Sequence, residues 1–173
     1  MKRKIFLAVL LFLISASTGG LFAQAQKPVD PVNWRELVPF LIDIAGYEAE
    51  KPEGTTTAMA EFKLSQVSRE YTKGESSLEI EIIDGSYIPL AYASFQAMQA
   101  FEVDSSEELI RKVTIQGFPA IEHMQFEDKE ATLMILVAER FLVNLRGENY
   151  ENTSEVKAVS EKLDLKRLAS LAK

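Results

Sequence analysis

The sequence contains no cysteine and only one histidine, His123, in 173 residues. Without cysteine the chain can form no disulfide and carry no lipid on a mature N-terminal cysteine, so its stability must come from its core. Zinc sites are usually built from three or four ligands rich in histidine and cysteine, which this chain cannot supply. We therefore expect no metal site and no cofactor, and we interpret His123 as a structural or exposed residue.

Phosphate-binding and catalytic motifs are also missing. Neither G-x-x-x-x-G-K nor G-x-G-x-x-G occurs, and no G-x-S-x-G elbow presents a serine to His123. The acidic turns "DSSEE" and "FEDKE" lack the spaced acids and central glycine of a calcium loop. A carboxylate pair for glycoside hydrolysis stays open, although Glu79 and Glu81 fit the solvated side of a strand. We name no catalytic, cofactor-binding or metal-binding residue.

Positive charge is scarce. The chain has 19 Lys and Arg residues against 26 Asp and Glu residues, a formal net charge of −7. Binding to nucleic-acid phosphates or to anionic lipid calls for a basic surface, so the composition argues against both kinds of partner. We prefer high solubility to an acidic docking surface as the explanation of this charge.

Long apolar runs are absent except near the start of the chain. Lys2, Arg3 and Lys4 precede an apolar run over 5–14, and Ala23-Gln24-Ala25 fits a signal peptidase site. The run has about half of the roughly 20 residues of a spanning helix, so we prefer cleavage after Ala25 to a retained anchor. The prediction is a signal peptide over 1–25, a periplasmic or secreted protein, and no stable membrane insertion after cleavage.

The remaining sequence predicts one domain. Residues 26–32 read as a flexible lead, and 33–173 show no repeat, linker or low-complexity tract. The apolar periodicity alternates between helical and strand-like segments, in the order α-β-β-α-β-β-β-β-α. The predicted fold class is therefore α+β, an antiparallel sheet of about six strands with helices packed on it.

Local signals place the ends of several elements. Asn33 and Glu36 resemble a capping box at the start of the first helix, and Pro39 predicts a kink or break in it. Phe62 and Leu64 are out of phase with Val67 and Tyr71, so we expect a bulge around Ser65-Gln66 in one long strand. Asn152 or Thr153 is expected to cap the last helix, and Asp164 a separate final turn.

The stretch "SYIPLAYASFQAMQAF", residues 86–101, has no charged residue. Its apolar residues fall on one side at helical spacing, and we interpret it as a helix that covers a sheet. A membrane span does not fit its length and its two glutamines. Tyrosine and methionine are enriched in contact patches, so a surface for a partner is the alternative. The residues of that possible contact surface are Tyr87, Ile88, Tyr92, Phe95, Gln96 and Gln99.

The succession "REYTKGESSLEIEIID", "IQGFPAIEHMQF", "LMILVAERFLVNLRGEN" and "LDLKRLASL" resembles a family of exported bacterial proteins of unassigned activity. The layout, with "GFPA" leading into a strand, more distantly resembles PsbP-like sandwich domains. This resemblance implies an accessory or assembly role rather than catalysis. It carries over no functional residue, because the matching positions are turns and core patterns.

These observations lead to three functional hypotheses. The first is an exported, non-enzymatic accessory or binding protein of the cell envelope, whose partner is a protein or a small apolar ligand. The second is a hydrolase that uses acidic side chains, which requires a cleft with two carboxylates and a raised pKa on one of them. The third is a purely structural envelope domain, which requires neither a pocket nor an exposed apolar patch.

Overall fold

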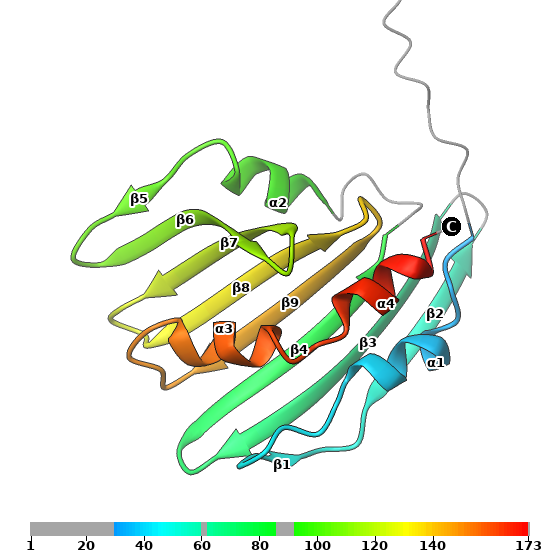
Figure 1. The fold of residues 1–173 in the computed structure, drawn as a ribbon, viewed down its shortest axis with the longest axis horizontal. Helices are drawn as coiled ribbons and strands as arrows, with labels where there is room; N and C mark the ends of the chain where they lie inside the picture. The colour runs from blue at the N-terminus through cyan, green and yellow to red at the C-terminus, as the bar shows by residue number, and fades with distance from the viewer. Residues whose placement is uncertain (1–29, 60–61, 86–91, 173) are drawn as a thin grey trace, which may run out of the picture.

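A computed structural model describes residues 30–59, 62–85 and 92–172. The chain folds into one antiparallel sheet whose strand order is β1-β3-β4-β9-β8-β7-β6-β5, with β2 also paired to β3 (Figure 1). The strands are β1 (Glu48–Ala49), β2 (Glu53–Met59), β3 (Phe62–Lys73), β4 (Ser76–Asp84), β5 (Val103–Asp104), β6 (Glu108–Ile115), β7 (Phe118–Gln125), β8 (Glu130–Val137) and β9 (Phe141–Glu148). The helices are α1 (Trp34–Leu37), the 3₁₀ helix η1 (Val38–Phe40), α2 (Ala93–Met98), α3 (Ser154–Ser160) and α4 (Leu165–Ser170).

The predicted fold class is wrong in its strand count and in its element order. The described residues form a nine-stranded sheet, not six strands, and their helices are short. The strands absent from the prediction are β1, β2 and β5. Two of these have two residues each, too few to show an alternation of apolar side chains, and β2 has the sequence EGTTTAM, which reads as a polar loop.

The bulge expected around Ser65 does not exist. From Ser65 to Lys73, β3 pairs with β4 without an inserted residue. Val67 is fully buried on one side of the strand, whereas Leu64 lies half-buried on the other. The change of phase therefore reflects a strand with apolar side chains on both faces, not a bulge in the backbone.

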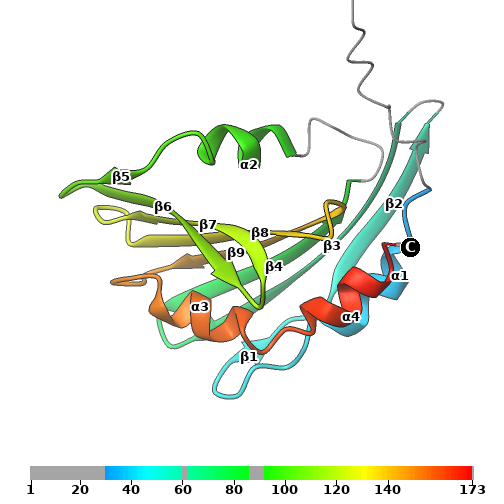
Figure 2. The same ribbon diagram turned by 45° about the horizontal axis from the view of Figure 1, so that its top comes forward.

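Helices lie on both faces of the sheet. In Figure 2, α1, α3 and α4 lie on one side, the helix-covered face, and α2 lies alone on the opposite side. Every second residue of a strand points to this face. Leu78, Ile80 and Ile82 of β4 are examples, and they are completely buried against α1, η1, α3 and α4. This face holds the main core of the molecule.

Local signals in the sequence explain how these helices begin and end. The side chain of Asn33 accepts a hydrogen bond from the backbone N–H of Arg35, and Glu36 completes the predicted capping box of α1. Pro39 lies in η1, where α1 has given way to a 3₁₀ turn. Asp164 accepts from the N–H of Arg167 and caps α4, which separates it from α3 as expected. Among the described residues no helix is long and apolar enough to cross a bilayer.

A buried ion pair joins the two ends of the described chain to the sheet. Arg140, in the turn between β8 and β9, donates from Nη2 to Asp84 Oδ2 at 2.8 Å and from Nε to Asp84 Oδ1 at 3.0 Å. The backbone N–H of Val32 also donates to Asp84, at 2.8 Å. Arg140 further donates to the carbonyl oxygens of Asp30 and Leu171. The pair therefore holds residues from both ends of the chain at one point.

Candidate binding face beside helix α2

We call the face of the sheet that α2 packs on the α2 face. Helix α2 covers only part of it, and we call the rest the open part of the α2 face. Phe95 of α2 is 1% exposed and packs in a cluster with Ile110, Ile121 and Leu142. Met98, one turn later in α2, joins the edge of this cluster. The apolar side chains of β6, β7, β8 and β9 are thus gathered under α2, and the polar remainder of the face lies beside the helix.

The structure places the residues of the predicted contact surface in different environments. Tyr87 and Ile88 lie outside the described residues. Tyr92 is half-buried and its hydroxyl donates to the carbonyl oxygen of Arg140, and burial raises its pKa to about 12. Phe95 is a core residue and offers nothing to a partner. Gln96 is exposed and Gln99 is half-exposed. Of the predicted contact residues that the structure describes, these two therefore offer their side-chain amides to a partner.

Strand register arranges the polar part of the α2 face in rows that cross the sheet. The first row runs from β3 to β7 and contains, in order, Glu70, Glu79, Arg146, Thr132 and His123. The second row runs from β2 to β8 and contains, in order, Glu53, Ser68, Glu81, Asn144 and Met134. Neighbouring strands are about 4.8 Å apart, so each row is a line of adjacent side chains.

A hollow of about 420 Å³ opens where these rows meet α2. It is lined by Glu79, Glu81, Met98, His123, Glu130, Thr132, Met134, Asn144 and Arg146. A second hollow of about 410 Å³ lies over β2 and β3 and shares Glu81 with the first. Together the two hollows make the open part of the α2 face a continuous polar surface with an apolar rim at Met98.

The electrostatics of the first hollow are unbalanced. Burial, together with the charges of Glu81 and Glu70, raises the pKa of Glu79, and the opposing effects of the Arg146 charge and of a hydrogen bond with Ser68 are smaller. Arg146 instead pairs with Glu130, its Nη2 atom lying 2.8 Å from Oε2. That hydrogen bond raises the pKa of Arg146. The charges of Glu81 and Glu70 therefore act on Glu79 more strongly than the opposing charge of Arg146 does.

Asn144 and His123 complete the polar lining of the hollow. Asn144 donates from Nδ2 to Glu81 Oε2 at 3.1 Å, while its Oδ1 atom is buried and has no hydrogen-bond partner among the described residues. His123 Nε2 lies 2.7 Å from Glu108 Oε1, so its ring is held by β6. A buried acceptor without a donor is uncommon in folded proteins. The polar lining of the hollow thus includes one buried acceptor that the described residues leave unpaired.

Sequence reasoning found only part of this site. It placed Glu79 and Glu81 on one face, but it interpreted them as ordinary solvated residues. It missed Asn144 and Arg146, although their alternation with apolar residues in "FLVNLRG" indicates a second face of β9 with polar side chains. Among the described residues, no three acidic or histidine side chains converge where they could hold a metal ion.

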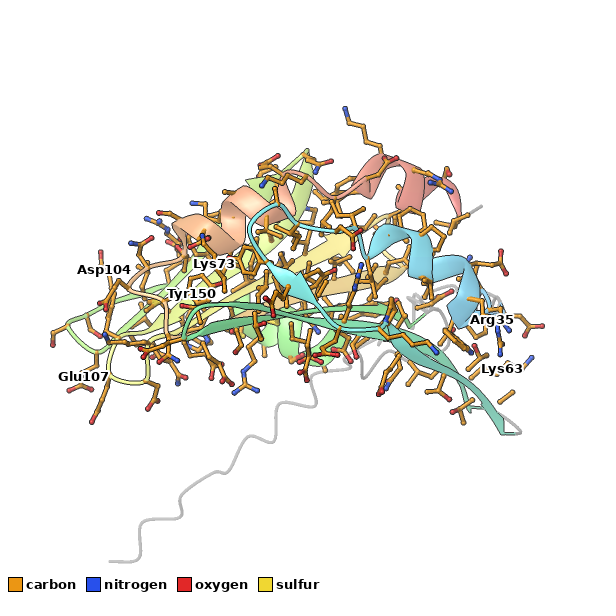
Figure 3. All side chains as sticks on the ribbon, turned by 90° about the horizontal axis from the view of Figure 1, so that it is seen from below. Arg35, Lys63, Lys73, Asp104, Glu107 and Tyr150 are labelled. Carbon is orange, nitrogen blue, oxygen red and sulfur yellow. The ribbon has the colours of Figure 1, made fainter. Side chains whose placement is uncertain are left out.

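A second polar cluster, on the helix-covered face, satisfies its own hydrogen bonds. The hydroxyls of Tyr47 and Tyr150 lie 2.9 Å apart, and Tyr47 donates to Glu155 Oε1 at 2.8 Å. Lys73 pairs with the same carboxylate, and Figure 3 shows Lys73 and Tyr150 close together. Its polar atoms are paired with one another, so we interpret this cluster as structural.

The chain was compared with known proteins at three levels. No family model, no curated protein and no solved structure matches it. Its resemblance to exported bacterial proteins and to PsbP-like domains therefore stays a prediction.

Proposed function

We propose that this chain is an exported, non-enzymatic accessory protein of the cell envelope that binds its partner on the open part of the α2 face. The observation that carries the proposal is the hollow of about 420 Å³ between α2 and the polar rows of β4, β8 and β9. Binding sites are generally concave and combine apolar walls with a few convergent polar groups. The lining has this composition, because Met98 and Met134 supply apolar surface and Glu79, Glu81 and Asn144 supply polar groups.

The unused acceptor of Asn144 supports a binding role. Leaving a buried oxygen without a donor costs about 1–3 kcal/mol. A surface that keeps polar residues for recognition at a cost in stability explains why such a group is kept in the middle of β9. A purely structural envelope domain would gain stability from an apolar residue at this position.

Helix α2 supports the same role from the other side of the hollow. Its outer surface carries Gln96 and Gln99 and no charge, and Met98 reaches the rim. Methionine adapts its shape to different partners at little cost. A partner seated in the hollow would therefore also touch α2, as the uncharged stretch in the sequence predicts.

Acid hydrolysis is the second candidate function, and one observation favours it. Glu79 has a raised pKa and lines the hollow together with Glu81, and a carboxyl with a raised pKa beside a second carboxyl is the arrangement that acid hydrolysis requires. Assays with chromogenic glycosides and esters decide between the two. Turnover that falls about a hundredfold or more in Glu79→Gln would replace the binding role with a catalytic one.

The binding role is tested by filling the hollow. Thr132 lies half-buried on its floor in β8, and Thr132→Phe adds bulk without lowering strand propensity. Thr114→Phe makes the same change at an exposed position of β6 and serves as the matched control. The tagged full chains are recovered from cells that naturally produce the protein, and co-purifying components are compared by mass spectrometry.

We expect at least one component to co-purify with the wild type and the Thr114 variant and to fall about tenfold or more with the Thr132 variant. Recovery of the same components with all three chains, in equal amounts, would show that the hollow is not the binding site.

A further inference from the structure

The charges of β3 are sorted by face. Lys63, Arg69 and Lys73 point to the helix-covered face, where each pairs with an acidic side chain. Glu70 points to the α2 face and lies directly opposite Glu79 of β4. Like charges directly opposite each other on neighbouring strands destabilise a sheet. The alternation of β3 therefore moves cations away from a surface that already contains acidic residues.

The acidic residues of this surface receive little compensation from the rest of the protein. Arg146 is committed to Glu130 at 2.8 Å and to Glu148 at 3.7 Å. In the described part of the chain, no basic side chain lies within ion-pair distance of Glu53, Glu70, Glu79 or Glu81. The raised pKa of Glu79 reports the same imbalance.

We infer that the open part of the α2 face binds a basic peptide segment of its partner, whose lysine or arginine side chains pair with the carboxylates of Glu53, Glu70, Glu79 and Glu81. This inference rests on the proposed function and names the partner's chemistry. The four acids are spread over β2, β3 and β4 instead of converging on one point, which suits several cations carried on an extended chain. A segment with alternating basic residues would present them on one side.

The rim of the hollow suits the same occupant. Lysine and arginine have long aliphatic stems that pack on apolar surface while their charged ends reach polar groups. Met98 and Met134 provide that apolar surface next to Glu81 and Asn144.

The test is a binding titration with a defined probe. A fluorescein-labelled peptide that alternates lysine with serine is titrated with the full chain, and fluorescence anisotropy is followed at low and at physiological ionic strength. Glu79→Gln/Glu81→Gln removes two charges from the proposed surface. Glu107→Gln/Glu161→Gln removes two exposed charges elsewhere, since Glu107 lies at the far end of the molecule (Figure 3) and Glu161 follows α3.

We expect affinity for the peptide to fall about tenfold or more in the Glu79/Glu81 variant and less than about twofold in the control variant. Removing the repulsion should leave the Glu79/Glu81 variant at least as stable to urea as the wild type, which separates lost binding from lost folding. Equal losses in the two variants would reduce the effect to net charge and overturn the inference. Tighter binding of spermidine or Ca²⁺ alone, with displacement of the peptide, would overturn it as well.

The two proposals fail in different ways. If the wild type ignores the basic peptide but Thr132→Phe still loses a native component, the hollow binds a partner of other chemistry and only this inference falls. If Thr132→Phe changes no native component, the proposed function falls, whatever the peptide does.

Discussion

Single acidic residues show how differently the two faces of the sheet are built. Glu122 of β7 points to the helix-covered face, and its side chain is 0% exposed. It accepts hydrogen bonds from Arg111 of β6, from the hydroxyl of Thr153 and from Lys157 of α3. On the opposite face, Glu79 has no such set of donors. The protein thus gives Glu122 three donors where helix α3 covers it, and it gives Glu79, where we place the binding surface, less compensation than burial and neighbouring charges demand.

Glu122 gives a prediction for the pH dependence of stability. Burial alone would raise its pKa, but hydrogen bonds from Arg111 and Thr153 and the charge of Lys157 hold it below its ordinary value of 4.5. A carboxyl whose folded pKa is lowered stabilises the fold above its unfolded pKa, and this contribution is lost as pH falls through the folded pKa. We therefore expect the wild type to lose stability as pH falls below about 4.5.

The matching variant is Glu122→Gln. It should be about 1–3 kcal/mol less stable than the wild type at neutral pH, because charge-assisted hydrogen bonds are lost. The difference should shrink as pH falls from about 4.5 through the lowered folded pKa, because the unfolded wild-type chain takes up the proton first and the folded carboxylate takes it up only at lower pH. Urea unfolding at several pH values measures both effects. A difference that is constant from neutral to acid pH would contradict this account.

The sequence predicted the single-residue features that act locally, and it missed those that need distant partners. The capping residues Asn33 and Asp164 bond to backbone groups within three residues of themselves, so the local sequence is enough to predict them. Glu122 gave no such signal, because Arg111, Thr153 and Lys157 come from other elements. The unpaired Oδ1 of Asn144 depends on the arrangement of β4 and β9 in the same way.

At the scale of elements, β2 shows why the sequence pattern did not predict part of the sheet. Its Gly54 reads as a turn residue, but a Cβ atom there would lie 2.6 Å from Trp34 Cε3, so the glycine lets the indole of α1 pack on the strand. Its Thr56 forms a hydroxyl–hydroxyl hydrogen bond of 2.8 Å with the buried Ser65 of β3. Because most residues of β2 are polar or glycine, the strand shows no apolar alternation, and only its pairing with β3 in the folded chain reveals it.

Helix α2 gives a prediction about local stability. Phe95 is its single fully buried side chain, and Phe95→Ala should cost about 3–5 kcal/mol of the stability of α2. Phe101, which is 47% exposed, provides the control, and Phe101→Ala should change stability by less than about 0.5 kcal/mol. Hydrogen exchange measures the effect element by element.

We expect the amides of α2 to lose protection in the Phe95 variant while those of β8 and β9 keep most of theirs. Because Met98 would leave the rim of the hollow, binding on the α2 face should weaken too. Uniform loss of protection over the whole sheet would mean that α2 and the sheet unfold together.

At the scale of the whole molecule, the sheet joins distant parts of the chain. Strand β9 pairs with β4 on one side and with β8 on the other. It therefore joins the first four strands of the chain to the later strands β5 to β8. The order of strands in the sheet depends on these long-range pairs. Apolar alternation marks where a strand lies but not its neighbour, which is why the sequence did not predict the arrangement.

The predicted export of the chain is tested by the N-terminus of the mature protein. Cleavage after Ala25 leaves Asp30 and Val32, which bind Arg140 and Asp84, within the mature chain. We expect N-terminal sequencing of protein recovered from the periplasm or the medium to begin at Gln26. Recovery from the cytoplasm of a chain that begins at Met1 would count against export.

A truncation series adds a thermodynamic control. A chain that begins at Gln26 should melt as the mature protein does. One that begins at Asn33 lacks the contacts of Asp30 and Val32 with the buried ion pair, and its melting temperature should be about 3–8 °C lower. Equal melting temperatures would show that the lead contributes nothing.

The junction at Arg140 has a consequence for how the chain could be rewired. The carbonyl oxygens of Asp30 and Leu171 bind one guanidinium group, so a short peptide could join these positions into a ring. New ends opened at the exposed hairpin around Gly74 would then yield a circular permutant. In such a permutant the ribosome would synthesise the strands in a different order, but each strand would pair with the same neighbours. Comparing its folding kinetics with those of the wild type would separate the effect of strand order on folding from the final structure.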